Sequence, residues 1–163
     1  MLFSGSVRSN VDLLGVHDDA AIWSALDRAG LGPAIREIEQ VTDAGITMKA
    51  GLDSMVTEGG LSLSAGQRQL MCLSRALLRN TKILLLDEAT ASVDSDTDEM
   101  VQRTIRQEFA HATRLVIAHR LDTIIDCSRV LVLQAGNIEE FASPHELLQN
   151  PEAFPSPPSH RQS

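Results

Sequence analysis

Aromatic residues are scarce in this sequence: they make up 3% of its 163 residues and include no tyrosine. With one tryptophan and four phenylalanines, the chain has to build a hydrophobic core mainly from aliphatic side chains. Hydrophobic residues still account for 43% of the sequence, so a chain of this length can bury a core of its own. The composition predicts one ordinary globular domain.

Positive charge is also in short supply. Lys and Arg number 14 against 22 Asp and Glu, which gives a formal net charge of -8 and a pI near 5.0. Such a surface is poorly suited to neutralising a phosphate backbone, so we do not expect nucleic acid as a partner.

Membrane and redox signals are missing as well. No apolar stretch approaches the roughly 20 residues that span a bilayer, and no basic segment followed by an apolar one opens the chain. We therefore expect a soluble chain that is not exported. Cys72 and Cys127 lie far apart and belong to no CxxC or Cys/His grouping, which predicts reduced intracellular thiols without a metal or redox role.

Structural signals are weak over the first 60 residues. Residues 1–15 show no clear period, whereas apolar residues spaced along one helix face predict a helix over residues 18–31. Pro33 can open a short helix reaching Glu39. Glycines interrupt the remainder as far as residue 60, so we expect a loop-rich region there.

From residue 63 onward, helices and strands alternate. A helix is expected over residues 67–79, closed by Arg79-Asn80, and another from Ser95, with Asp98 in a capping box and Val101, Ile105 and Phe109 on its inner face. Apolar runs at residues 82–88 and 114–118 are typical of strands buried on both faces. This alternation predicts an α/β fold with a parallel sheet.

The last part of the chain carries clear turn and cap signals. A short helix is expected over residues 121–126, followed by a hairpin of residues 130–133 and 138–141. Ser143 is placed to cap a final helix, which Asn150-Pro151 would end. Residues 151–163 are rich in Pro and Ser, and we expect them to be disordered.

Polar residues follow both predicted strands directly. In parallel sheets ligands gather at the carboxyl ends of the strands, where Asp87, Glu88 and His119 fall. Such residues can be plain caps or solvated side chains. Alternatively, Asp87 organises Mg²⁺, since hard cations prefer carboxylate oxygen, and Glu88 orients or deprotonates an attacking water. Three polar residues on one rim favour the second interpretation.

Residues 61–70 read LSLSAGQRQL and place small polar residues directly before a helix. Ser64 and Gly66 precede unpaired N–H groups at the positive end of the helix dipole, which is a natural cradle for phosphate. Gly66 also lets a ligand approach the backbone closely. Taken alone, the stretch is better explained by an ordinary serine N-cap with a flexible glycine.

The same stretch resembles the signature motif, usually LSGGQ, of ATP-binding-cassette ATPases. The next motifs also resemble this family in order and spacing: the Walker B strand with its D-loop corresponds to ILLLDEATASVD, and the switch-histidine strand to LVIAHR. Similar segments include LFSGSVRSNVD, TEGG and RVLVLQAGNIEEFASPHELL. Together they resemble the second nucleotide-binding domain of subfamily C, multidrug-resistance-associated exporters, over about residues 1–150.

The resemblance implies a cofactor site for Mg²⁺ and ATP. Ser64, Ala65, Gly66 and Gln67 would contact the γ-phosphate of an ATP molecule that a partner domain mainly holds. Ala65 stands where the family usually has glycine, and a small side chain should be tolerated there.

The resemblance also implies a hydrolytic half-site. Asp87 would hold Mg²⁺ through water, Glu88 would act as the general base, and His119 would contact the γ-phosphate as a sensor. Asp94 would belong to the D-loop that couples two sites across a dimer.

One departure from the family pattern is large. Its N-terminal part carries an adenine-stacking aromatic, a GxxxxGK[ST] phosphate loop and a glutamine that senses Mg²⁺. None is found here, and the only lysines, Lys49 and Lys82, do not follow a glycine. We therefore expect a P-loop NTPase of the ABC ATPase type truncated at the N-terminus, with no Walker A strand or loop and no ATPase activity alone.

Within that fragment, we expect residues 16–66 to form the helical and signature region and residues 67–150 the C-terminal part of a RecA-like core. The implied function is part of an exporter that couples ATP binding and hydrolysis to transmembrane transport. Its partners would be a second nucleotide-binding domain and transmembrane domains at the cytoplasmic face of a membrane, and the chain expressed alone would be cytoplasmic.

Two alternatives come from other classes of protein. The chain could be a non-enzymatic interaction module that pairs with another ABC ATPase domain. A chromosome-maintenance ATPase head shares the signature and Walker B motifs, but it has long coiled coils beside the signature. The residues before Leu61 show no sustained heptads, which disfavours this last reading.

Overall fold

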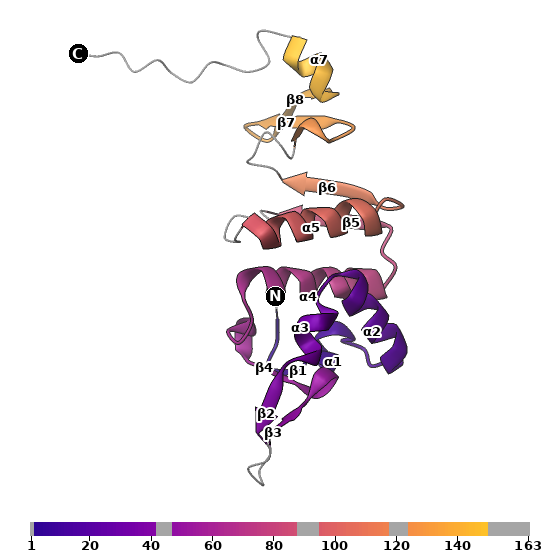
Figure 1. Cartoon of the computed structure of the whole chain (residues 1–163). Coiled ribbons are helices and arrows are strands. Elements are labelled where there is room, and N and C mark those ends of the chain that lie inside the picture. The colour runs from indigo at the N-terminus through magenta and orange to yellow at the C-terminus, as the bar shows by residue number, and fades with distance from the viewer. Residues whose placement is uncertain (1, 42–46, 88–94, 118–123, 150–163) are drawn as a thin grey trace, which may run out of the picture. The chain divides into compact units, whose positions relative to one another are not determined.

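The computed structural model describes residues 2–41, 47–87, 95–117 and 124–149 (Figure 1). The chain divides into two compact units, residues 1–116 and 117–163, which are described separately. Across the described ranges, no helix combines the length and the apolar character needed to cross a membrane.

The first unit is built from short helices and strands followed by two long helices. Its elements are β1 (Gly5–Ser6), α1 (Val7–Val11), α2 (Asp19–Arg28), α3 (Gly32–Arg36), β2 (Glu39–Val41), β3 (Thr47–Lys49), η1 (Gly51–Asp53), β4 (Met55–Val56), η2 (Glu58–Gly60), α4 (Ala65–Leu78), β5 (Ile83–Asp87), α5 (Ser95–Glu108) and β6 (Thr113–Ile117), where η denotes a 3-10 turn.

The predicted helix after residue 18 is confirmed as α2, and local signals explain both of its ends. The Asp18 carboxylate accepts a hydrogen bond from the Ala21 N–H at 2.8 Å, which caps the first turn. At the other end Gly30 takes a φ of 79°, and the Gly30 and Leu31 N–H groups donate back to the Asp27 and Leu26 carbonyls. This is a Schellman closure, which glycine adopts readily because it has no Cβ.

The signature helix α4 ends in the same way, with asparagine instead of glycine. Asn80 has a φ of 48°, and its N–H donates to the Leu77 carbonyl at 3.0 Å. The next N–H, of Thr81, reaches the Ala76 carbonyl at 3.3 Å. The predicted end of this helix at Arg79-Asn80 is therefore confirmed, and asparagine suits it because its side chain tolerates the left-handed region.

A single aliphatic core lies among α1, α2, α4 and α5, as the composition predicts. Figure 1 shows α4 and α5 as two long helices, and each packs on the other in this unit. The predicted inner face of α5 is confirmed, since Val101, Ile105 and Phe109 are all buried. Phe109 is the one aromatic side chain among the fully buried residues of the described chain.

The expectation that both apolar strands are buried on both faces is wrong. On β5 the burial alternates: Leu84 faces the core, whereas Ile83 and Leu85 are 69% and 66% exposed. Leu115 on β6 is also exposed. Successive side chains of a strand point to opposite faces, and in the described structure only one face of β5 meets the core. An apolar run shows that a strand is made of hydrophobic residues, but it does not show whether other elements cover both of its faces.

Within the described residues, the predicted α/β arrangement is represented by the strands β5 and β6 and by the helix α5 that lies between them in the sequence. Strands β5 and β6 are neighbours in a two-stranded sheet, and the Thr113 N–H donates to the Lys82 carbonyl at 2.9 Å beside them. A helical crossover of this kind is the connection that parallel strands require.

Several elements of the first 60 residues were not predicted. Strands β2 and β3 pair antiparallel, with Glu39 opposite Lys49, so α3 ends before Glu39 and not at it. Strands β1 and β4 also pair, with Gly5 opposite Val56. Strands of two or three residues are too short to show the alternation by which a strand is recognised, and the partner of β1 also lies far away in the sequence.

The second unit contains β7 (Val130–Gln134), β8 (Asn137–Ala142) and α7 (Pro144–Gln149). The predicted hairpin is confirmed, with antiparallel pairing and positive φ at both turn residues, Ala135 and Gly136. Positive φ at both central positions matches the right-handed twist of the two strands. The helix expected over residues 121–126 lies partly outside the described residues, and the tail expected to be disordered lies wholly outside them.

The final helix, α7, begins with the predicted cap. The Ser143 hydroxyl accepts from the Glu146 N–H at 3.3 Å, and the Ser143 N–H donates to the Glu146 carboxylate at 2.8 Å. Hydrogen bonds from the Ser143 backbone and hydroxyl hold the pKa of Glu146 below its ordinary value.

The core predicts a clear difference between two leucines of the first unit. Leu26 on α2 is completely buried, whereas Leu14 is 76% exposed. We expect Leu26→Ala to lower the free energy of unfolding by about 2–5 kcal/mol, because it leaves a cavity, and the matched control Leu14→Ala to change it by less than about 0.5 kcal/mol. Urea unfolding followed by circular dichroism measures both; equal losses would contradict this assignment of the core.

Candidate functional site

The carboxyl end of β5 presents Asp87. By strand alternation its side chain shares the exposed face of Ile83 and Leu85, and the Asp87 side chain is itself exposed. No hydrogen bond or ion pair joins its carboxylate to any other described residue, so its oxygens are open to a ligand. Glu88, Asp94 and His119, the other residues expected at this rim, lie outside the described ranges. Among the described residues no group of three or more His, Cys, Asp or Glu could hold a metal ion.

The second predicted site residue, Ser64, is the N-cap of α4. Its Oγ accepts a hydrogen bond from the Gln67 N–H at 3.1 Å, and the Gln67 Oε1 accepts one from the Ser64 N–H at 2.9 Å. This reciprocal pair is a capping box. The ordinary N-cap interpretation of Ser64 is therefore confirmed, and helix α4 begins two residues before the expected start.

The capping box leaves part of the helix end unsatisfied. Of the four N–H groups that have no partner inside a helix, the box pairs those of Ser64 and Gln67. The N–H groups of Ala65 and Gly66 have no acceptor among the described residues. Ser64 is exposed, and its hydroxyl hydrogen can still be donated. Two backbone donors and one hydroxyl therefore lie at the positive end of α4, which suits an anion, although Gly66 itself is buried.

The loop before α4 is held by its own hydrogen bonds. The Gly60 N–H donates to the Thr57 carbonyl at 2.8 Å, and the Leu63 N–H donates to the Gly60 carbonyl at 2.9 Å. The Ser62 N–H donates to the Thr57 hydroxyl at 3.2 Å. From inside the helix, the Arg68 guanidinium donates to the Leu63 carbonyl at 2.7 Å. These bonds fix the chain on both sides of the cap.

Gly60 is required at its place in this loop for two reasons. It has a φ of 72°, which disfavours residues with a side chain. A Cβ at this position would also lie 2.6 Å from Leu2 Cδ1 and 2.9 Å from Arg68 Cδ. The second glycine of TEGG thus lets the N-terminal segment and the first turn of α4 approach each other.

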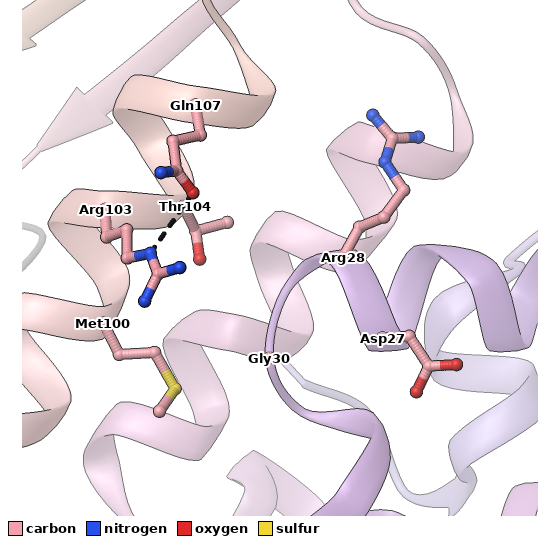
Figure 2. A pocket seen from close by; sticks show the side chains of 7 residues that line it. All are labelled: Asp27, Arg28, Gly30, Met100, Arg103, Thr104 and Gln107. Carbon is pink, nitrogen blue, oxygen red and sulfur yellow. Dashed lines mark hydrogen bonds between the residues drawn. The ribbon is translucent and has the colours of Figure 1, made fainter.

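A hollow of about 260 Å³ lies between the end of α2 and α5, away from the predicted site (Figure 2). The two charges on its α2 side are already paired: Asp27 accepts two hydrogen bonds from Arg36 at 2.6 and 2.8 Å, and Arg28 donates to Glu108 at 2.7 Å. Figure 2 shows the charged ends of Asp27 and Arg28 directed away from Arg103, which bonds Gln107 at 3.3 Å. None of the predicted site residues lines this hollow.

Comparison with known proteins identifies the family of the chain that carries the α4 terminus. The sequence model of the family described as "ABC transporter" matches residues 4–91, which is more than half of the chain. The chain belongs to the ABC transporter family. Within this match lie the capping box of α4 and the strand that ends in Asp87.

Several relatives of this ABC transporter chain belong to subfamily C. It is 51% identical over 151 residues to ABC transporter C family member 3 of Dictyostelium discoideum, covering 93% of this chain and 10% of that protein. Against ATP-binding cassette sub-family C member 2 of Homo sapiens the identity is 51% over 154 residues, covering 94% of this chain and 9% of that protein. The chain therefore spans about a tenth of the length of these curated relatives.

A solved structure confirms the fold. A bacterial Atm1-family ABC exporter with ATP bound matches with a TM-score of 0.75 and 33% sequence identity, over 91% of this chain and 24% of that chain. The predicted fold class is confirmed: this is an ABC ATPase domain with the P-loop NTPase fold. The individual roles of the motif residues stay predictions.

Sequence reasoning expected unpaired N–H groups at this helix start and offered a serine N-cap as the alternative, but it missed the part that Gln67 plays. The structure shows both features together: Ser64 and Gln67 form the cap, and the two amides between them have no acceptor among the described residues. The signal for the cap was present, since Ser64 followed three residues later by Gln67 fits the capping-box pattern.

The capping box makes a prediction about stability. We expect Ser64→Ala to lower the free energy of unfolding by about 1 kcal/mol, because the Gln67 N–H loses its acceptor, and Ser64→Asp to retain nearly all of it, because aspartate caps equally well. The matched control is Ser62→Ala, where only the backbone N–H makes a bond in the loop. A loss in Ser64→Asp as large as in Ser64→Ala, measured by denaturant unfolding, would argue against the cap.

Proposed function

We propose that this chain forms part of the second nucleotide-binding domain of a subfamily C ABC exporter and takes part there in coupling ATP binding and hydrolysis to transmembrane transport. The observation that carries the proposal is the open pair of amides at Ala65 and Gly66, next to the exposed Ser64 and within the family match. A helix end of this kind attracts phosphate through its unpaired N–H groups and its dipole.

The domain boundaries follow from the same proposal. Residues 1–150 form the partial nucleotide-binding domain, with the helical and signature region at about residues 16–66 and the C-terminal part of the RecA-like core at residues 67–150. The matches to relatives, which reach 94% of the chain, support an assignment that covers nearly its whole length. Residues 151–163 are the proposed disordered tail.

The α4 terminus is the proposed γ-phosphate contact. The Ala65 and Gly66 N–H groups and the Ser64 hydroxyl donate to phosphate oxygens of an ATP molecule held mainly by a partner nucleotide-binding domain. The Gln67 Oε1 accepts the hydrogen bond of the helix cap, so the amide NH₂ of Gln67 remains as a further donor. The small residues at positions 64–66 admit a phosphate group that a large side chain would exclude.

The end of β5 is the proposed hydrolytic half-site. Asp87 fits the role of a Mg²⁺ ligand through water, because its carboxylate is exposed and makes no ion pair with the described residues. Mg²⁺, when bound there, neutralises charge on the phosphates. Glu88 takes a proton from the attacking water, His119 contacts the γ-phosphate, and Asp94 couples the site to a second one.

The proposed partners are a second nucleotide-binding domain and the transmembrane domains of the same transporter, at the cytoplasmic face of a membrane. The alternative is a non-enzymatic module that pairs its signature face with another ABC ATPase domain. Hydrolysis of ATP through Glu88 separates the two.

The proposed base predicts a selective loss of chemistry. In a longer protein that contains this chain, we expect Glu88→Gln to lower ATP turnover by roughly 10²–10⁴-fold and leave ATP binding almost intact, since a general base acts on the reaction and not on the phosphate contacts. Glu99→Gln, an equal change at an exposed position on α5, is the control. Turnover of Glu88→Gln within a few-fold of wild type would refute its role, and a wild-type protein that binds ATP without hydrolysing it would support the module.

The phosphate contact makes a second prediction, which separates binding from folding. Ser64→Asp keeps the helix cap but sets a negative charge against the phosphate, and Ser64→Arg fills the space with a large side chain. We expect both to block ATP-driven closure of the paired nucleotide-binding domains, measured by cysteine crosslinking across their interface. Ser62→Asp adds the same charge two residues earlier and should close normally; normal closure of Ser64→Asp would contradict the contact.

A further inference from the structure

The far half of α4 is tied to the beginning of the chain through Arg75. Its guanidinium donates from Nε to the backbone carbonyl of Asn10, a residue 65 positions away. A second bond runs from Nη2 to Asn10 Oδ1 at 2.9 Å. The same guanidinium lies over the ring of Phe3, 5.6 Å from its centroid, so a cation–π contact adds to the hydrogen bonds. Arg75 thus engages two separate residues of the N-terminal segment.

Asn10 is the centre of that segment and is fully buried. Its Nδ2 donates to the Phe3 carbonyl at 2.8 Å and to the Ser6 carbonyl at 3.1 Å, while its Oδ1 accepts from the Phe3 N–H at 3.0 Å. One side chain therefore fixes the course of residues 3–10. Removing Arg75 would take charged donors from two buried oxygens of Asn10, which is costly in an environment with little water.

The bonds at Arg75 bear on the other end of α4 because the helix is continuous. It runs from Ala65 to Leu78 without a break, so about 15 Å separate residues 65 and 75 along its axis. Its buried residues pack against α1, α2 and α5. A change of tilt at Arg75 therefore moves the first turn, where Ala65 and Gly66 present their open N–H groups.

We infer that Arg75 is a positioning residue: by holding Asn10 it fixes the direction of α4 against the N-terminal segment, and so sets where the Ala65 and Gly66 N–H groups meet the γ-phosphate. This inference rests on the proposed function of the α4 terminus. Arg75 itself does not touch the nucleotide. Its effect is to make the phosphate contact depend on the position of residues 3–10.

The test uses ATP hydrolysis by the full-length transporter that contains this chain. Arg75→Met keeps the unbranched apolar stem and removes every donor. We expect the ATP concentration for half-maximal turnover to rise about tenfold, equivalent to about 1.4 kcal/mol, with a smaller change in the maximal rate per folded protein. The control is Arg79→Met, an exposed arginine that is the C-cap residue of the same helix, with an expected change of less than about twofold.

The position of the half-maximal concentration separates positioning from mere stability. A purely structural role lowers the amount of folded protein and hence the maximal rate, but leaves the half-maximal ATP concentration unchanged. Arg75→Lys retains the charge and one bond to Asn10 but cannot reproduce the planar pair, so we expect an intermediate shift. If Arg75→Met does not fold, Arg75→Lys decides, and a wild-type half-maximal concentration in that variant overturns the inference.

Failure of this inference and failure of the proposed function look different. If Ser64→Arg blocks turnover while Arg75→Met and Arg75→Lys keep the wild-type half-maximal concentration, the phosphate site stands and the positioning role is overturned. If the wild-type transporter does not hydrolyse ATP, or Ser64→Arg leaves turnover unchanged, the proposed function falls and the positioning role falls with it.

Discussion

Burial of the apolar face of α4 is the interaction on which the first unit depends. Leu70, Met71, Leu73 and Leu77 lie in the core, where the helix meets α1, α2 and α5. A helix held along its length in this way does not need every group at its ends to be paired. The same packing that stabilises the unit therefore lets α4 leave two N–H groups in its first turn without an acceptor among the described residues, because their cost is small against the apolar area removed from water.

Helices with strong local signals could be predicted from the sequence. Helix α4 has apolar residues along one face and a terminal Asn80, α2 has Asp18 before it and Gly30 after it, and α7 has its Ser143 cap. Each of these signals acts within a few residues, so no knowledge of distant contacts is needed. The hairpin of β7 and β8 was predictable for the same reason, since its turn is set by two adjacent residues.

Features that depend on distant parts of the chain could not be predicted. Gly5 gives no hint that it pairs with Val56, and nothing near Asn10 points to Arg75. The prediction that β5 is buried on both faces failed for a related reason. Leu84 and Leu85 are the same residue type, and only their surroundings differ. For the site, the α4 terminus and Asp87 could be identified from the sequence. Only the structure shows which groups of this terminus form the Ser64–Gln67 cap and which amides are left without an acceptor.

The capping box has a consequence for how much the signature stretch can vary. Because Ser64 and Gln67 bond the backbone of the helix itself, the open donors at positions 65 and 66 are peptide N–H groups, which nearly every amino acid supplies. Replacement of the usual glycine by Ala65 therefore changes the bulk of the site and not its hydrogen-bonding chemistry. The exception is proline, which fits the first position of a helix but has no N–H to offer. Exchange of Ala65 for proline would preserve the shape of this helix end while deleting one of its two donors, so a sequence that still looks well folded could have lost half of its backbone contact with phosphate.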